Sequence, residues 1–447
     1  MFSIRDSSVC LLFVMVLIGA LPDSSRAATI YVSPAGDDAN AGSAQQPVAT
    51  PAQAVSLAAP GDTILLHGGR YAIMHFLWIN KAGVSVGSFP KETAVLAGSS
   101  SDEEGLPFVV CVAADKVALV NLEIVGGAHY GVKVDAVGDS NATTGVQIRG
   151  CRIRDTGTDC IKTVNADHLL IEDCDIGPSG VRDPSNAEGI DSVGSLGVTI
   201  RRCHVHDTTT NGLYLKGGAK DGVVECCRVE RTGKFGGILL GQDTDEQFMR
   251  DGSKYEAVHC VARNNIVAGT GAAGLGTYSG DDIRFENNTL VDVARESQAG
   301  LWVVTNSRGT PSRGVVFKNN IVTTSGTRPV VFVKDLAGRL DCDCNLYFTT
   351  HGACRFSVET GDSGKTGEYS FAQWTAQTRA DARSQNADPM LDPAGPYVPR
   401  AGSPAIGRGE AIPEVKVDFS GHPRPAGVAP DIGAQQHSDP ARAQVPR

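Results

Sequence analysis

The stretch NGLYLKGG, from Asn211 to Gly218, places a tyrosine and a lysine on one face of a predicted β-strand. Its alternation puts Tyr214 and Lys216 opposite Leu213 and Leu215, because successive side chains of a strand point to opposite faces. A lysine can act as a general base when neighbouring charges or a bound cation shift its pKa. The chemistry of this strand therefore depends on the side chains that adjacent strands bring to it.

A sequence repeat supplies these adjacent strands. Segments such as VQIRGCRI, VTIRRCHV and VVFKNNIV share one order of apolar and polar residues around a central position, here called the ladder position. The ladder residues are Leu122, Cys151, Cys174, Cys203, Cys227, Asn265, Asn288, Asn320 and Asn345. Their separations of 23 to 38 residues are typical of a solenoid with a fixed coil and variable loops. Period-two alternation and glycine turns predict an all-β fold, a single right-handed parallel β-helix.

We predict that the four ladder cysteines stack on one internal line, which the four asparagines continue. Stacked asparagine side chains can hydrogen-bond along the ladder, whereas buried cysteines act as small, unreactive filler. Disulfides remain open among the other cysteines of the exported chain, which are Cys111, Cys160, Cys226, Cys260, Cys342, Cys344 and Cys354. The DCDC motif at Asp341 to Cys344 is interpreted as a half-buried strand rather than a zinc site.

Aligning the strand that follows each turn predicts columns of side chains about 4.8 Å apart. The first column contains Tyr130, Asp159, Glu188, Asn211 and Gly236. The second contains Lys133, Lys162, Asp191, Tyr214 and Leu239, and a third contains Asp135 and Lys216. The polar side chains therefore gather on four successive coils.

Two interpretations of this polar patch stay open. In the first, it is a solvated sheet face on which opposite charges pair across strands. In the second, Asp159, Glu188 and Asp191 bind Ca2+, since converging carboxylates suit that ion, and the loop from Pro178 to Gly189 could add Asp183 or Asn186. A lysine beside such a site could remove the C5 proton of a uronic acid, so the patch fits β-elimination.

Other side chains are candidates for binding. Tyr278 and Trp302 lie in the same strand series and could stack on sugar rings, although ordinary packing also explains them. His204 and His206 share one strand face, and we interpret them as solvated because no third metal ligand stands nearby in the sequence.

The N-terminal residues predict export. Arg5, an apolar run from Val9 to Leu21 and small residues up to Ala27 are typical of a signal peptide, and no segment is a convincing membrane span. The net charge of −10 argues against nucleic acid as a partner, and we expect a monomer that binds an acidic polysaccharide. The expected organisation is a signal peptide at 1–27, a β-helix at 28–350, a closing segment at 351–437 and a disordered tail at 438–447.

Both ends of the mature chain resemble a known family. The segment from Ile30 to Tyr71, and the closing motifs SPAIGRG and VDFSGHPRPAGVAPDIGAQQH, are similar to secreted β-helix proteins of the pectate lyase superfamily, nearest the family-nine polysaccharide lyases. The resemblance implies a short capping helix from Ala52 to Ala59. It also implies a lysine base beside acidic calcium ligands; the family's lysine column falls on Tyr214, with Lys216 one step further along the same face. Lys216 is our first candidate base and Lys162, in the column of Tyr214, is the second.

We therefore predict a polysaccharide lyase that cleaves a uronic-acid polymer with Ca2+. A glycoside hydrolase is the alternative enzyme, because the segment from Gly157 to Asn165 resembles a strand of β-helix galacturonan hydrolases and paired carboxylates are present. The doubled aspartate and the Gly-His-Gly loop of those hydrolases are missing. A polysaccharide-binding surface protein without catalytic activity is the third alternative.

Overall fold

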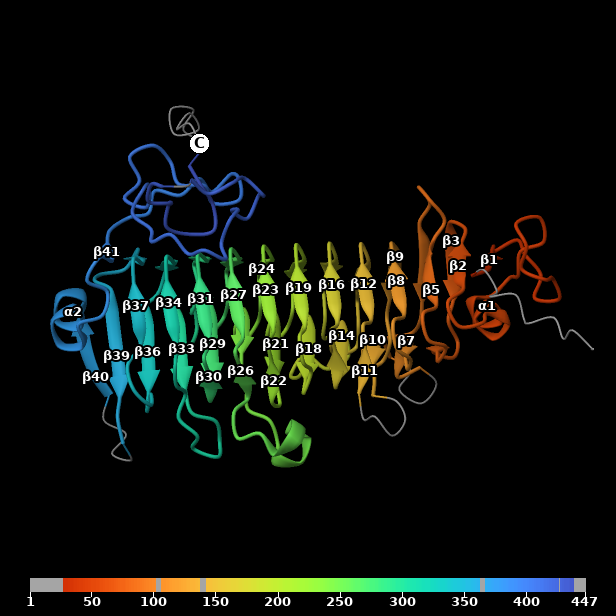
Figure 1. The fold of residues 1–447 in the computed structure, drawn as a ribbon, viewed down its shortest axis with the longest axis horizontal. Coiled ribbons are helices and arrows are strands. Elements are labelled where there is room, and N and C mark those ends of the chain that lie inside the picture. Colours follow the sequence, from red (N-terminus) through yellow and green to blue (C-terminus); the bar gives the residue numbers. More distant parts are fainter. Residues whose placement is uncertain (1–26, 102–105, 137–141, 362–365, 426, 438–447) are drawn as a thin grey trace, which may run out of the picture.

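A computed structural model describes residues 27–101, 106–136, 142–361, 366–425 and 427–437. The chain winds into a long solenoid of parallel strands (Figure 1), which confirms the predicted all-β parallel helix. The expected C-terminal tail at 438–447, and all but the last residue of the expected signal peptide at 1–27, lie outside the described residues. In the described part of the chain, no helix has the length and apolar character to cross a membrane.

Three sheets of twelve strands each run along the solenoid, and successive strands of the chain join them in turn. Sheet A extends from β1 (Thr29–Val32) to β37 (Asp341–Asp343), and sheet B from β3 (Gly69–Ala72) to β41 (Gln385–Asn386). Sheet C contains β4 (Leu77–Ile79), β7 (Phe108–Val112), β10 (Tyr130–Val134), β14 (Ile161–Val164), β18 (Ile190–Val193), β21 (Leu213–Lys216), β25 (Ile238–Leu240), β29 (Leu275–Tyr278), β33 (Leu301–Val304), β36 (Val331–Lys334), β39 (Arg355–Glu359) and β40 (Thr366–Ser370).

The register of sheet C confirms the predicted columns. Along the second column, each residue pairs with its predicted neighbour, in the order Lys133, Lys162, Asp191, Tyr214 and Leu239. Val193 pairs with Lys216, which also confirms the place of the third column. Most inward residues of these strands are buried and apolar, so the hydrophobic core fixes which face points outward.

The predicted asparagine ladder is confirmed at the corner between sheets A and B. The Nδ2 atom of Asn288 donates to the carbonyl of Ala262 (2.9 Å), and its Oδ1 atom accepts from the backbone N–H of Asn265 (3.0 Å). Asn320 and Asn345 repeat both bonds one coil further along. The residue before each asparagine has a left-handed backbone, as at Asn287 with φ 54°, which gives the corner its sharp bend. The ladder bonds offset this strained conformation.

The four ladder cysteines lie on the same line, as predicted. Their thiols point to carbonyls of the preceding coil, such as Cys174 Sγ to the oxygen of Ile148 (3.4 Å) and Cys203 Sγ to that of Ile171 (3.6 Å). They thus take the donor position of the asparagine amide with a weaker group. All eleven described cysteines are free, so none of the disulfides left open by the sequence forms among them.

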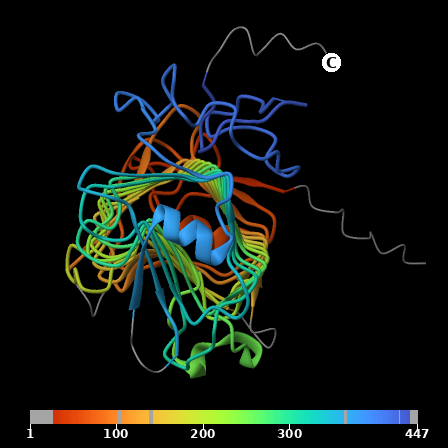
Figure 2. The same cartoon turned by 90° about the vertical axis from the view of Figure 1, so that its left-hand side faces the viewer.

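Each end of the solenoid is covered. The expected capping helix is present as α1 (Pro51–Leu57), whose first turn is closed by the Thr50 side chain accepting from the N–H of Gln53. At the other end α2 (Phe371–Thr378) lies across the last coil (Figure 2), and its Trp374 is buried beside Phe356. The parallel sheets continue beyond 350, up to β41, before the chain folds back along the solenoid.

Removing one rung of the ladder should destabilise the fold. We expect Asn288→Ala to lower the free energy of unfolding by about 2 kcal/mol or more, because a buried N–H and a buried carbonyl lose their partners. Urea denaturation followed by circular dichroism measures the change, with the exposed Asn80→Ala as control. Equal midpoints for the two variants would contradict a structural role for the ladder.

Candidate active site

Three carboxylates converge on the outer face of sheet C. Asp159 and Glu188 precede β14 and β18, and Asp191 lies on β18. Each side chain is buried, and one oxygen from each lies within 4.8 Å of the others. The register of the sheet therefore brings Asp159 beside Glu188 and Asp191, which lie 29 and 32 positions later in the sequence, as the columns predicted.

Hydrogen bonds hold this acidic cluster in place. The backbone N–H of Glu188 donates to Asp159 Oδ1 (3.0 Å). Thr210 Oγ1 (2.9 Å) and Asn211 Nδ2 (3.1 Å) both donate to Glu188 Oε1. Asn211, which its place in the first column makes a further candidate for substrate binding, is thus buried and orients a carboxylate.

The acidic cluster is only partly compensated among the described residues, where Lys162 contacts Asp191. Burial, together with the charges of Glu188 and Asp191, raises the pKa of Asp159 well above its usual value. Glu188 Oε2 and Asp191 Oδ1 are buried without a hydrogen-bond partner among the described residues. Unpaired buried carboxylate oxygens are costly unless a proton or a cation satisfies them, and several oxygen ligands suit Ca2+. The donor set of Asp159, Glu188 and Asp191 therefore fits a calcium ion.

The two candidate lysines have different surroundings. Lys162 contacts Asp191 directly; burial lowers its pKa, but the charges of Asp191 and Asp159 outweigh this effect and raise it. Lys216 is half-buried, and its Nζ atom lies 4.4 Å from the centre of the Tyr214 ring. Lys216 makes no ion pair within the part of the chain that the structure describes.

Tyr214 lies beneath Lys216 and is buried. Burial first, and then the negative charges of Asp191, Glu188 and Asp159, raise the pKa of its hydroxyl well above the usual value. Tyr214 therefore stays protonated at neutral pH and can serve as a hydrogen-bond donor.

A cleft of about 650 Å³ opens above these side chains. Lys162, Asp191, Tyr214 and Lys216 line it, together with Asn186 from the loop between β17 (Asp175–Ile176) and β18. Asp183 of the same loop instead accepts hydrogen bonds from Ser185 in a local turn. Of the two extra ligands that the sequence suggested, the structure brings only Asn186 to the cleft.

One wall of the cleft was missed by the sequence analysis. It is the insertion at 243–251, which carries η2 (Glu246–Phe248) and the start of η3 (Arg250–Gly252) and projects below the solenoid in Figure 1. Arg250 fixes the insertion by hydrogen bonds to Asp167 (2.5 Å) and to the carbonyl of Gly194 (2.8 Å). The 38-residue separation of Cys227 and Asn265, the longest in the repeat, was the available signal.

The aromatic side chains nearest the acidic cluster also differ from those expected. Tyr278 and Trp302, on β29 and β33, do not line the cleft; Trp302 stacks on Phe332 with ring centres 4.3 Å apart. On the other side of the cluster, Tyr130 shares the column of Asp159, and its ring lies parallel to that of Phe108 at 6.3 Å.

A further ring extends this second set along sheet C. Phe76 lies 5.0 Å from Phe108, so Phe76, Phe108 and Tyr130 form an aromatic row that leads to the acidic cluster. Such a row can support sugar rings by stacking.

The raised pKa of Asp159 gives a testable pH dependence. A carboxyl whose pKa is higher in the folded state favours folding at low pH, and this contribution is lost as pH rises through the raised value. In chelator, the melting temperature of the wild type should therefore fall between pH 4 and 8 more steeply than that of Asp159→Asn. The exposed Asp251→Asn should keep the wild-type slope. Equal slopes of melting temperature against pH for the wild type and Asp159→Asn would show that ionisation of the buried Asp159 does not destabilise the folded protein.

Comparisons with solved structures show where this fold recurs. Pectate lyase Pel9A is 15% identical over 93% of this chain and 97% of its own, with a TM-score of 0.56. XylC in complex with xylose is 10% identical over 92% and 98%, with a TM-score of 0.57. A rhamnogalacturonan lyase is 13% identical over 88% and 99%, with a TM-score of 0.53. At these identities the likeness shows a shared fold.

The family comparison is more specific. No curated protein sequence matches the chain significantly. The family described as "Pel9A-like, right handed beta helix region" matches residues 30–269, more than half of the 447 residues. This match covers the coils that carry the acidic cluster, the cleft and the aromatic row. The chain therefore belongs to the Pel9A-like right-handed β-helix family.

Proposed function

We propose that the protein is an exported polysaccharide lyase that cleaves a uronic-acid polymer by β-elimination. The observation that carries the proposal is the buried acidic cluster, with unpartnered oxygens, beside lysines in an open cleft. Two proteins with the same fold, pectate lyase Pel9A and a rhamnogalacturonan lyase, support an acidic polysaccharide as the substrate class.

β-Elimination requires removal of a proton beside a carboxylate. Asp159, Glu188 and Asp191 would hold Ca2+, which would withdraw electron density from the substrate carboxylate and make the C5 proton more acidic. Lys216 takes that proton in its neutral form. We prefer Lys216 to Lys162 as base because the contact with Asp191 keeps Lys162 protonated. Lys162 can then bind the substrate carboxylate as a cation.

As the C4–C5 double bond forms, the C4–O4 bond breaks, and water in the open cleft protonates the leaving O4. Tyr214, whose hydroxyl stays protonated, pairs in register with Asp191, and its ring supports the side chain of Lys216. The aromatic row lies along sheet C on one side of the acidic cluster, so we propose that the polymer runs along this sheet, across the strands.

The geometry favours a lyase over an inverting hydrolase. Inverting hydrolases hold their two carboxyl groups about 6.5–9.5 Å apart to admit a water molecule. One oxygen from each carboxylate of the acidic cluster lies within 4.8 Å of the others, which suits one shared cation better.

Replacement of the base should abolish elimination without unfolding the protein. We expect Lys216→Ala to reduce turnover by roughly 10²- to 10⁴-fold, the usual contribution of positioned proton transfer. The assay is ultraviolet absorbance of unsaturated uronides, with pectate, alginate and glycosaminoglycans as substrates. Melting temperature should change little, since Lys216 is half-exposed and unpaired among the described residues.

Two further lysines serve as matched comparisons. Lys162→Ala should weaken substrate binding, and Lys133→Ala tests a neighbour whose pKa is lowered by burial. A large loss of turnover in either variant with none in Lys216→Ala would move the base. Reducing ends without ultraviolet absorbance would indicate a hydrolase, and neither product would indicate a binding protein.

Calcium should stabilise the folded protein through the acidic cluster. A ligand at 100 times its Kd adds about 2.7 kcal/mol to stability, so saturating Ca2+ should raise the melting temperature and chelator should lower it. Asp191→Asn should lose this shift, whereas Asp251→Asn should retain it. A melting temperature that is independent of Ca2+ would leave a salt-bridged sheet face as the better interpretation of the patch.

A further inference from the structure

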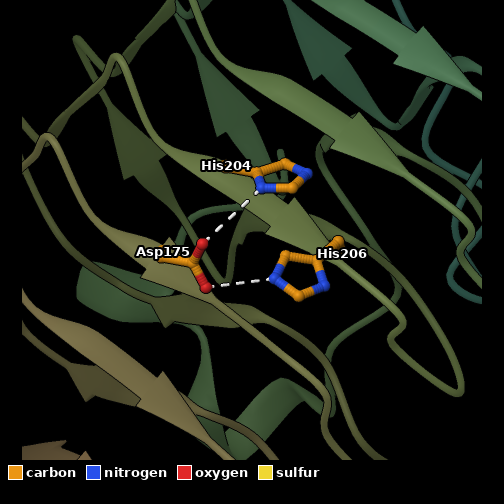
Figure 3. Close-up of side chains that lie close together, drawn as sticks. All are labelled: Asp175, His204 and His206. Atoms are coloured by element: carbon orange, nitrogen blue, oxygen red, sulfur yellow. Dashed lines mark hydrogen bonds and ion pairs between the residues drawn. The ribbon is translucent and has the colours of Figure 1, made fainter. Parts of the chain in front are cut away.

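A second cluster of metal-ligating side chains lies on the outer face of sheet B. Asp175 on β17 pairs in register with His204 on β20 (His204–His206), and both histidine rings face the Asp175 carboxylate (Figure 3). The sequence interpretation of His204 and His206 as a solvated pair assumed that no third ligand was near. That assumption is wrong, because the preceding coil supplies Asp175.

The distances between the Asp175 oxygens and the histidine nitrogens are close to those between the ligand atoms of a zinc site. Only small side-chain movements would be needed to bind the ion. His206 Nε2 lies 3.1 Å from Asp175 Oδ1, and His204 Nδ1 lies 3.7 Å from Asp175 Oδ2. Two ligand atoms bound to a tetrahedral zinc ion at about 2.1 Å lie about 3.4 Å apart. The imidazole rings are stacked, with centres 4.4 Å apart and planes at 28°, so one nitrogen of each ring reaches the same carboxylate.

The outer nitrogens of both rings are already occupied. His204 Nε2 lies 3.1 Å from Glu230 Oε1, and His206 Nδ1 lies 2.7 Å from Asp207 Oδ2. A hydrogen bond from the ring N–H to each carboxylate leaves the lone pairs of His204 Nδ1 and His206 Nε2 directed at Asp175. Histidines that bind metals are usually oriented by carboxylates in this way.

The two carboxylates that hold the outer nitrogens are themselves paired with arginines, so they are fixed in place. Arg231 pairs with both Asp207 and Glu230, and Arg228 also pairs with Glu230 (2.6 Å).

Of the three carboxylates around the two histidines, Asp175 has the longest ion pair with an arginine. Arg152 lies 3.7 Å from it, and the Arg152 side chain is 56% exposed, so it can move into solvent.

We propose that Asp175, His204 and His206 bind a divalent transition-metal ion such as zinc, with water completing the coordination. Two imidazoles and one carboxylate suit zinc better than Ca2+, which prefers oxygen ligands alone. The bound ion links two successive coils, and the next strands of these coils, β18 and β21, carry Asp191 and Lys216. The site thus fastens together the two coils that form the floor of the cleft.

Zinc titration of the full mature chain tests the site. The protein is stripped of metal and kept in saturating Ca2+, so that the acidic cluster does not compete, and zinc chloride is added in a calorimeter. We expect one zinc ion per chain and a higher melting temperature. Glu230→Gln should weaken binding roughly 10- to 100-fold, as loss of an outer partner does. The double variant His204→Gln, His206→Gln should lose binding by a larger factor.

Two controls make the result decisive. His259→Gln removes an exposed histidine 3.6 Å from Asp221, which lacks a second imidazole, and should leave zinc binding unchanged. Arg152→Ala should tighten binding by freeing Asp175.

A second measurement uses Co2+ in place of zinc. The visible absorbance of bound Co2+ reports coordination by the same ligands and does not depend on the heat of binding. Equal zinc affinity in the wild type and the double variant, with circular dichroism showing both folded, would overturn the proposal.

Discussion

Every part of this structure depends on each coil stacking on its neighbour without slipping by one residue. A slip would turn the buried face of every strand outward, because side chains alternate along a strand. The corner ladder prevents it: each asparagine amide bonds to backbone groups of the adjoining coil, and left-handed residues fix the bend. Where cysteines replace asparagine, the neighbouring apolar strands carry more of the register, since a thiol bonds weakly.

The rigid stack allows an arrangement that a looser fold would avoid. Asp159, Glu188 and Asp191 bring three acidic groups together in a buried position, which is unfavourable for folding when no cation is bound. Backbone and side-chain hydrogen bonds keep them there, while the continuous apolar core supplies the stability that offsets the repulsion. Strain concentrated at one place in an otherwise regular fold is typical of functional sites.

The sequence predicted the repeated coils of the solenoid and missed the insertion at 243–251 that interrupts them. Period-two alternation and the ladder were enough to place Lys162 beside Asp191, and Asp191 beside Tyr214, because register propagates from coil to coil. The same alignment puts Asp175 beside His204, so the third ligand was readable one residue after the ladder cysteines. The wall formed by Arg250 was not, since an irregular insertion has no periodicity and its place depends on bonds to Asp167, far away in sequence.

The elements that cover the two ends limit the length of the solenoid. Parallel coils present unpaired backbone groups at both ends, and another copy of the chain could add to them as a further coil. At the C-terminal end β40 pairs antiparallel with β39, so the last strand of sheet C no longer matches the direction of the repeat. With α2 across the last coil and α1 at the first, the ends no longer present open coils to which a second copy of the chain could add. The helix and the reversed strand therefore protect a repetitive protein against fibre growth.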